Sequence, residues 1–515
     1  MPNTQKDQLF ILIKSLTKAE KRNFKLYASR SQSGGDSKFL LLFDVLDRMV
    51  HYDDKLITKK VASIEKRHLP NLKRHLYKQI LTSLRLIHIQ KNIDIQIREQ
   101  LDFARILYGK GMYMQSLRLL ERIKNIAVDH HQDVLHLEVL EFQKLIESRH
   151  VTHSRQVENK MERLLMESLQ RSQITHDINL LSALNIQIHG YYIQYGHATE
   201  PDGQLKSIEF FNTHMPEGLD RRQLTFFEKV NLYQSWMWLH YINMDLVQAR
   251  KWAAQWVNLF AKDPRMSSKD PDLYIRSLYY LLMLLFLTHQ KEDFNRYLTY
   301  LKDFISNSWE ERNNNSKMMA SVYLNLTLLN HSLLHNDFQA GIEAIPSIQE
   351  GLAAYENYMD EYRSLLFDFK YAYLNFAVGD FEKSLDFLNN IILIKNPHLP
   401  KDLQIYASLL QLMCLYETEQ YDLMSYFISP LNRVLNKYPF KNKTQMHMLD
   451  FLKKLAMLAP TEAQQAFIAF DKQVAQLRKD PFEAKALHYL RPDFWTKSHL
   501  DNCTVEEASY ELEKV

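Results

Sequence analysis

The sequence predicts an all-α protein built as an array of helical hairpins behind a small helical N-terminal domain. The first observation is composition, because only 11 Gly and 14 Pro occur among 515 residues, whereas ordinary usage is roughly 7% Gly and 5% Pro. Scarce glycine argues against sheets with many tight turns and against α/β folds that bind nucleotides through glycine loops. The second is an abundance of Leu, Lys, Gln, Glu and Arg, which favour helices. The third is a recurring turn pattern.

This pattern marks the second helix of each predicted hairpin. A short polar turn precedes an aromatic or Leu anchor, a small residue follows three positions later, and apolar residues follow that one by four and seven positions. In the clearest copy Gly379-Asp380 precedes the anchor Phe381, and Ser384 is the small residue. We expect the Asp to cap the second helix and the small residue to let the two helices approach closely. The other anchors are Tyr113, Leu246, Phe294, Phe338 and Tyr421.

The turn, anchor and small residue around Phe381 resemble the second helix of a tetratricopeptide repeat. This resemblance covers about residues 93–478 and implies a right-handed α-solenoid of about eight or nine hairpins. The anchors from Leu246 to Tyr421 are 48, 44, 43 and 40 residues apart, longer than the period of about 34 that is usual for the family. The first-helix Trp and Gly of the family are mostly absent, so the repeats are degenerate.

Two prolines fall late in predicted second helices. Pro346 and Pro430 lie eight and nine residues past their anchors. Because the proline ring removes a hydrogen bond and clashes with the preceding turn, each is expected to kink its helix or, as the simpler alternative, to end it early.

Charge separates the N-terminal domain, predicted at 1–92, from the solenoid at 93–478 and a partly helical tail at 479–515. The first 100 residues hold 13 Lys and 7 Arg against 10 acidic residues, although the whole chain carries only +3. A long amphipathic helix is predicted from Pro70 to about Asn92. It places Arg74, Lys78 and Arg85 on a stripe away from its apolar face.

This layout resembles bacterial regulators that join a DNA-binding domain to a tetratricopeptide sensor. Basic side chains on a helix can neutralise phosphates in a groove of nucleic acid. No helix-turn-helix pattern with a glycine at its turn is found, and neighbouring acidic residues dilute the charge. A solvated helix face is therefore the alternative, and binding to a membrane surface is less favoured than either.

Motifs for catalysis, nucleotide binding or metal binding are missing, so we expect neither enzymatic activity nor a cofactor. His130, His131 and His136 form the densest polar cluster, and His150 and His153 lie one turn apart, but 21 scattered histidines produce such pairs by chance. The two cysteines form no spaced motif and indicate a reducing compartment. No signal peptide or transmembrane stretch is evident, so the expected location is the cytoplasm.

The leading hypothesis is a non-enzymatic scaffold or adaptor that binds a protein or peptide on the concave face of the array. The alternative is a nucleic-acid-associated regulator with a basic head and a sensor body. Association between identical copies stays open. The candidate groove residues come from predicted first helices, and they are Tyr323, Asn325, Lys370, Tyr371, Asn375, Tyr406 and Gln411.

Overall fold

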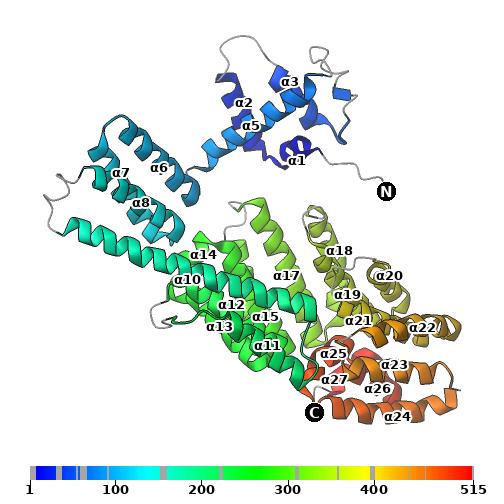
Figure 1. Ribbon diagram of the computed structural model, residues 1–515. Coiled ribbons are helices and arrows are strands. Elements are labelled where there is room, and N and C mark those ends of the chain that lie inside the picture. The colour runs from blue at the N-terminus through cyan, green and yellow to red at the C-terminus, as the bar shows by residue number, and fades with distance from the viewer. Residues whose placement is uncertain are drawn as a thin grey trace. The chain divides into compact units, whose positions relative to one another are not determined.

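The computed structural model is helical, as the composition predicts (Figure 1). It describes residues 7–30, 38–53, 56–57, 67–89, 92–150, 159–219, 224–307, 312–355, 359–394, 401–438, 440–458 and 460–512. Within these ranges there are 25 α-helices and no strand. The chain divides into two compact units, unit 1 at 1–175 and unit 2 at 176–515. The predicted solenoid range of 93–478 runs through both units, and the predicted domain boundaries stay predictions.

Unit 1 has two separate apolar cores. The first gathers around Phe24, Phe43 and Leu76, and the second around Leu101 and Leu120. The long basic helix of this unit ends at His88, four residues before its predicted end, because Asn92 instead caps the next helix by accepting the Asp94 N–H at 3.1 Å. The helices of unit 1 are α1 (Gln8–Ser15), α2 (Lys18–Arg30), α3 (Lys38–Arg48), α5 (Leu69–His88), α6 (Ile93–Gly109), α7 (Tyr113–Asp129) and α8 (Asp133–Arg149). Helix α10 (Lys160–Tyr195) continues into unit 2.

Unit 2 is a series of helix pairs that pack consecutively along the chain. Within pairs, α12 packs on α13, α17 on α18, α19 on α20 and α21 on α22. First helices also pack on the first helix of the following pair, as α15 does on α17, α19 on α21 and α21 on α23. This arrangement is that of a helical repeat. Its helices are α11 (Pro201–His214), α12 (Phe226–Ile242), α13 (Leu246–Lys262), α14 (Arg265–Lys269), α15 (Pro271–Leu287), α16 (Lys291–Ser306), α17 (Asn314–His335), α18 (Phe338–Ala353), α19 (Glu361–Ala377), α20 (Phe381–Ile392), α21 (Lys401–Glu417), α22 (Tyr421–Lys437), α23 (Lys443–Leu455) and α24 (Pro460–Leu477).

The predicted turn has the same backbone in successive hairpins. A residue with positive φ ends the first helix, and the next residue caps the second helix. In the α19–α20 hairpin the positive-φ residue is Gly379, the Asp380 N–H donates to the Asn375 carbonyl at 2.9 Å, and the Asp380 side chain accepts the Lys383 N–H at 3.2 Å. Asp245 and Asp337 cap α13 and α18 in the same way. The expectation that Asp opens the second helix is confirmed in these three hairpins.

One anchor was placed incorrectly. The turn of the α15–α16 hairpin is at His289-Gln290, so α16 begins at Lys291 and not at Phe294. Phe294 is fully buried three residues later, at the position that Gly341 and Ser384 hold in their hairpins. The sequence misleads here because a large aromatic residue occupies the position of the small one.

Neither proline ends its helix. Pro346 lies inside α18 and Pro430 inside α22. The apolar positions beyond each proline, Ile348 and Leu352 in α18 and Leu435 in α22, are buried. Their burial favours a continued helix and offsets the lost hydrogen bond.

The predicted tail is an ordered part of unit 2. Residues 481–512, here called the C-terminal segment, form a short 3₁₀ helix η1 (Pro481–Glu483) followed by α25 (Ala484–Leu490), α26 (Pro492–Asp501) and α27 (Val505–Leu512). Helix α25 packs on α21 and α23, and α26 packs on α24 (Figure 1). The segment belongs to the same continuous apolar core as the hairpins, since Leu490, Phe494 and Trp495 are buried within it.

Candidate functional site

The groove candidates on α17 differ in exposure. Tyr323 is buried, its ring stacks on that of Tyr279 with centroids 4.2 Å apart, and its hydroxyl accepts a hydrogen bond from Arg363 Nη2 at 2.9 Å. Asn325 is half-buried and its amide lies 3.4 Å from Ser321 Oγ. Tyr323 therefore packs α17 against α15 and α19.

The three candidates on α19 differ in burial and in their contacts. Tyr371 is buried with its ring 5.3 Å from that of Phe387 on α20, and Asn375 donates to the Tyr371 carbonyl at 2.7 Å. Lys370 is half-buried, and its Nζ donates to Asn330 Oδ1 at 2.5 Å. Lys370 alone among these three lines a cavity.

Both candidates on α21, Tyr406 and Gln411, are buried. The Tyr406 ring stacks on Tyr489 of the C-terminal segment at 5.4 Å. The expectation that the candidates line an open groove is wrong for the five that are only 2–5% exposed. The reason is clearest for α21, where most of Leu403–Leu415 is buried. Its sequence therefore has no polar face from which the side toward a groove could be inferred. The five are Tyr323, Tyr371, Asn375, Tyr406 and Gln411.

The C-terminal segment lies against the first helices of successive hairpins. The His488 ring meets Phe286 of α15 edge-on at 4.2 Å, and the Tyr489 ring lies 5.6 Å from that of Phe369 on α19. Trp495 Nε1 donates to Glu417 Oε1 of α21 at 2.6 Å. The C-terminal segment thus covers part of the first helices from which the groove candidates were predicted.

A buried ion pair fastens this segment to α21. Lys485 Nζ lies 2.6 Å from Asp402 Oδ2, and the two side chains are 8% and 18% exposed. Burial alone would lower the pKa of Lys485, but the Asp402 carboxylate and surrounding tyrosines raise that pKa well above its usual value. Burial would likewise raise the pKa of Asp402, but Lys485 lowers it. Both groups are therefore charged at neutral pH, and each needs the other.

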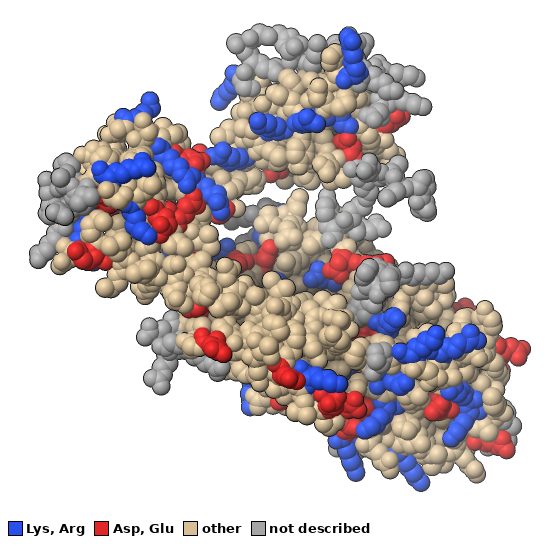
Figure 2. All heavy atoms as spheres, viewed as in Figure 1, with Lys and Arg blue, Asp and Glu red and all other residues tan. Residues whose placement is uncertain are grey.

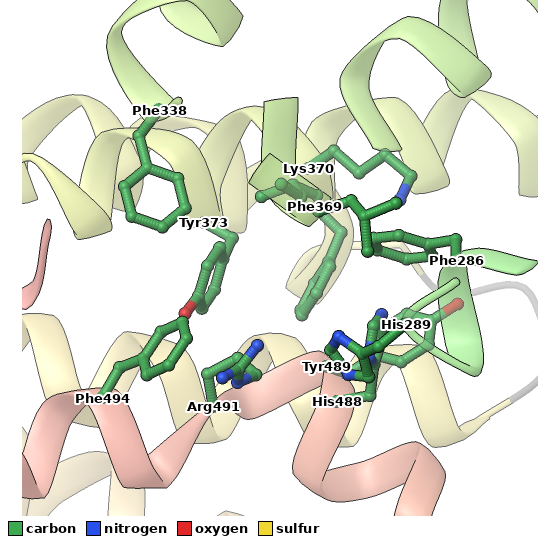
Figure 3. Close-up of a pocket in the computed structure, with 12 residues that line it drawn as sticks. Phe286, His289, Phe338, Phe369, Lys370, Tyr373, His488, Tyr489, Arg491 and Phe494 are labelled. Carbon is green, nitrogen blue, oxygen red and sulfur yellow. The ribbon is translucent and has the colours of Figure 1, made fainter. Parts of the chain in front are cut away.

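A cavity opens where the array meets the C-terminal segment. Figure 3 shows Tyr373 and Phe369 of α19 on one side of it, and Tyr489, Arg491 and Phe494 of the segment on the other. The empty space, including the part open to solvent, is about 500 Å³.

The polar groups of this cavity are mainly hydrogen-bond donors and cations. Burial lowers the pKa of Lys370 to about 8. Arg491 pairs with Asp493 at 3.1 Å and lies 3.4 Å from the centre of the Phe494 ring. Both ring nitrogens of His488 and the hydroxyl of Tyr373 are buried without a hydrogen-bond partner in the described structure. No Asp or Glu is among the described residues that line the cavity.

In unit 1, the predicted basic stripe lies on the surface of α5. Arg74, Lys78 and Arg85 are all exposed. Within the described ranges of unit 1, no carboxylate forms an ion pair with any of the three, whereas Lys21 pairs with Asp47 at 2.7 Å and Lys25 with Asp44 at 2.6 Å. The stripe is therefore a positive surface that no carboxylate of the described ranges neutralises.

Unit 2 also exposes a helix surface without charge. Residues 178–199, most of which belong to α10, contain no Asp, Glu, Lys or Arg. Ile186 and Ile193, nearly two turns apart on the same side of α10, are 72% and 53% exposed, and Leu205 on α11 is 66% exposed. Figure 2 shows a broad uncharged surface over this part of unit 2.

One histidine of each predicted cluster, His136 and His150, takes part in packing between side chains. His136 is buried on α8 beside Glu167, with Nε2 and Oε1 3.0 Å apart, and the His150 ring stacks on Tyr113 at 4.1 Å. His153 lies outside the described residues. Among the residues described, no group of three or more His, Cys, Asp or Glu side chains has the arrangement of a metal site.

Sequence reasoning missed the residues of the C-terminal segment. Lys485, His488, Tyr489 and Arg491 are distant in sequence from the helices that they contact, and no repeat pattern includes them. The aromatic density of 482–495, with Phe482, Tyr489, Phe494 and Trp495, was the available indication of a buried segment.

In the parts of the chain that the structure describes, no helix combines the length and the apolar character needed to cross a membrane. Comparison of the chain with protein-family models, with curated proteins and with solved structures gives no match.

Proposed function

We propose that the protein is a non-enzymatic interaction scaffold, a right-handed tetratricopeptide-like solenoid that holds a protein partner. The observation that carries this proposal is the uncharged surface of α10, where Ile186 and Ile193 are exposed. Surfaces that stay in water normally carry charge, whereas charged residues are depleted in the cores of protein interfaces. The partner would therefore present an apolar surface of its own, and it would dock on α10 instead of on the face covered by the C-terminal segment.

Site-specific photo-crosslinking in the cells that make the protein tests this proposal. With benzoylphenylalanine in place of Ile186, we expect a discrete adduct with one protein, which the additional change Ile193→Glu abolishes. Met457, 88% exposed outside α10, is the matched control position. Failure to form an adduct at 186, or the same adducts from 186 and 457, would contradict the scaffold.

A second candidate, binding of nucleic acid by unit 1, is favoured by the exposed stripe of Arg74, Lys78 and Arg85, with which no described carboxylate pairs. Three phosphate contacts would make the slope of log affinity against log salt more negative by about 2.7. We expect the triple alanine variant to bind a fluorescent DNA duplex and an RNA duplex more weakly, and its slope to be shallower by about this amount. The control variant changes three exposed lysines of unit 2, Lys251, Lys401 and Lys437, to alanine, so that both variants have the same net charge. Equal binding by both variants, or none at low salt, argues against this candidate.

A further inference from the structure

We propose that the cavity between α15, α17, α19 and the helices α25 and α26 binds a small organic anion with a flat apolar body. This inference goes beyond the scaffold function and does not depend on it. It follows from the walls of the cavity, from its charge and from its unpartnered polar atoms.

The walls suit a flat apolar body. Phe369 and Tyr489 pack on each other as a tilted pair, with ring centroids 5.6 Å apart at an angle of 45°, and both rings line the cavity. Phe286 and Phe494 extend the aromatic lining beyond them. Aromatic rings of this kind stack on planar ligands and exclude water from them.

The charge of the cavity suits an anion. The Nζ of Lys370 has an amide oxygen, that of Asn330, as its hydrogen-bond acceptor, and no described carboxylate forms an ion pair with it. Asp493 accepts from both Arg491 and Arg478, so two guanidinium groups share one carboxylate. Among the described residues that line the cavity, Lys370 and Arg491 are cationic and none is acidic, so the lining carries positive charge. A cation that is partly withdrawn from water and lacks a counter-charge is costly, and a bound carboxylate or sulfonate group would reduce that cost.

Unpartnered donors supply the remaining contacts. The Tyr373 side chain is 5% exposed, and its hydroxyl points into the space beside Phe494 (Figure 3). His488, whose ring nitrogens are buried, can donate one hydrogen bond while neutral. Both groups can donate hydrogen bonds to anionic oxygens without adding a charge.

The test uses ¹⁹F NMR on the full chain with 4-(trifluoromethyl)benzoate, and with the neutral 4-(trifluoromethyl)benzamide as its isostere. We expect saturable binding of one benzoate per chain, about tenfold tighter than the benzamide, as a charge-assisted hydrogen bond gives. Lys370→Met should reduce benzoate affinity to that of the benzamide and leave benzamide affinity unchanged. The control Lys251→Met, at an exposed site of unit 2, should change neither.

Three outcomes overturn the proposal: no saturable binding of either probe, equal affinity of the wild-type chain for both, or unchanged benzoate affinity in Lys370→Met. Lys370→Gln is the second variant, because Gln keeps a hydrogen bond to Asn330 while removing the charge. The comparison of the two probes on the wild-type chain requires no variant, so the proposal stays testable even if both substitutions disturb folding.

Discussion

At the scale of single residues, the Lys485–Asp402 pair is the interaction whose loss is expected to cost most. With 8% and 18% exposure, neither charge can be hydrated when its partner is removed. Lys485→Met should therefore lower the free energy of unfolding of unit 2 by about 3–5 kcal/mol. The double variant Lys485→Met with Asp402→Leu should lose less than Lys485→Met alone, because no charge is left unpaired.

Tryptophan fluorescence during urea unfolding measures this effect selectively. All six tryptophans, among them Trp256 and Trp495, follow residue 175, so the emission reports on unit 2. A double variant that loses the sum of both single losses would show that the pair is not coupled.

His197 makes stability depend on pH. Burial and the nearby Lys485 lower its pKa to about 3, against about 6.5 in the unfolded chain. Below pH 6.5 the unfolded state therefore takes up a proton that the folded state refuses, so the free energy of unfolding falls as pH falls from 6.5 toward 3. Above pH 6.5 this group has no such effect. The expected slope from one histidine is about 1.4 kcal/mol per pH unit.

Unfolding midpoints at pH 7.5 and 5.5 test this dependence. His197→Asn keeps a donor for the Tyr241 carbonyl, which lies 2.8 Å from Nδ1, and should weaken the loss between the two pH values. His176→Asn, at an exposed position, is the control. An unchanged pH dependence in His197→Asn would remove His197 as its source.

At the scale of the helix pair, Gly341 holds α18 close to its neighbours. A Cβ built there would lie 2.8 Å from Leu374 Cδ2 and 3.1 Å from Ser332 Cβ, and Leu374 is fully buried. Gly341→Ala should therefore destabilise unit 2 by about 1–3 kcal/mol. Gly351, in the same helix, has no such neighbours within 4 Å, so Gly351→Ala should stabilise the unit by about 0.5–1 kcal/mol. Tryptophan-monitored unfolding of both variants checks the contrast, and losses of equal size would refute it.

Within the helix pairs, local features could be predicted from the sequence and tertiary packing could not. The turns with Asp245, Asp337 and Asp380 were predictable because each depends on local backbone chemistry. Phe294 was misplaced because the tertiary position that it fills accepts either a small or a large side chain. Tyr371 and Tyr406 were placed in a groove because their helices are buried on most sides, which removes the periodicity that indicates a helix face.

At the scale of the molecule, the C-terminal segment was the part least accessible to sequence reasoning. Several of its contacts join residues about 80 or more apart, as in Lys485 with Asp402 and Asn336 with Ser509. Such pairings follow no repeat period, and only the folded chain brings them together. The basic stripe of α5 was predictable because the 3.6-residue period of a single helix places Arg74, Lys78 and Arg85 on one face.

The segment should also decide whether unit 2 folds. Glu483 accepts the Lys443 and Thr444 N–H groups at the start of α23, and Leu490, Phe494 and Trp495 are buried. Each such apolar side chain contributes about 1.5–3 kcal/mol, and with the Lys485 pair the total is comparable to the 5–15 kcal/mol that stabilises a whole domain.

A chain that ends at Lys479 should therefore lose the cooperative unfolding transition seen by tryptophan fluorescence. A chain that ends at Asn502 lacks only α27, whose contacts include the bond from Asn336 to the Ser509 carbonyl at 3.3 Å. It should unfold cooperatively at a moderately lower urea concentration. Wild-type unfolding of the shorter chain would mean that the hairpins are stable alone, and that the segment only occupies a face which they can expose to a partner.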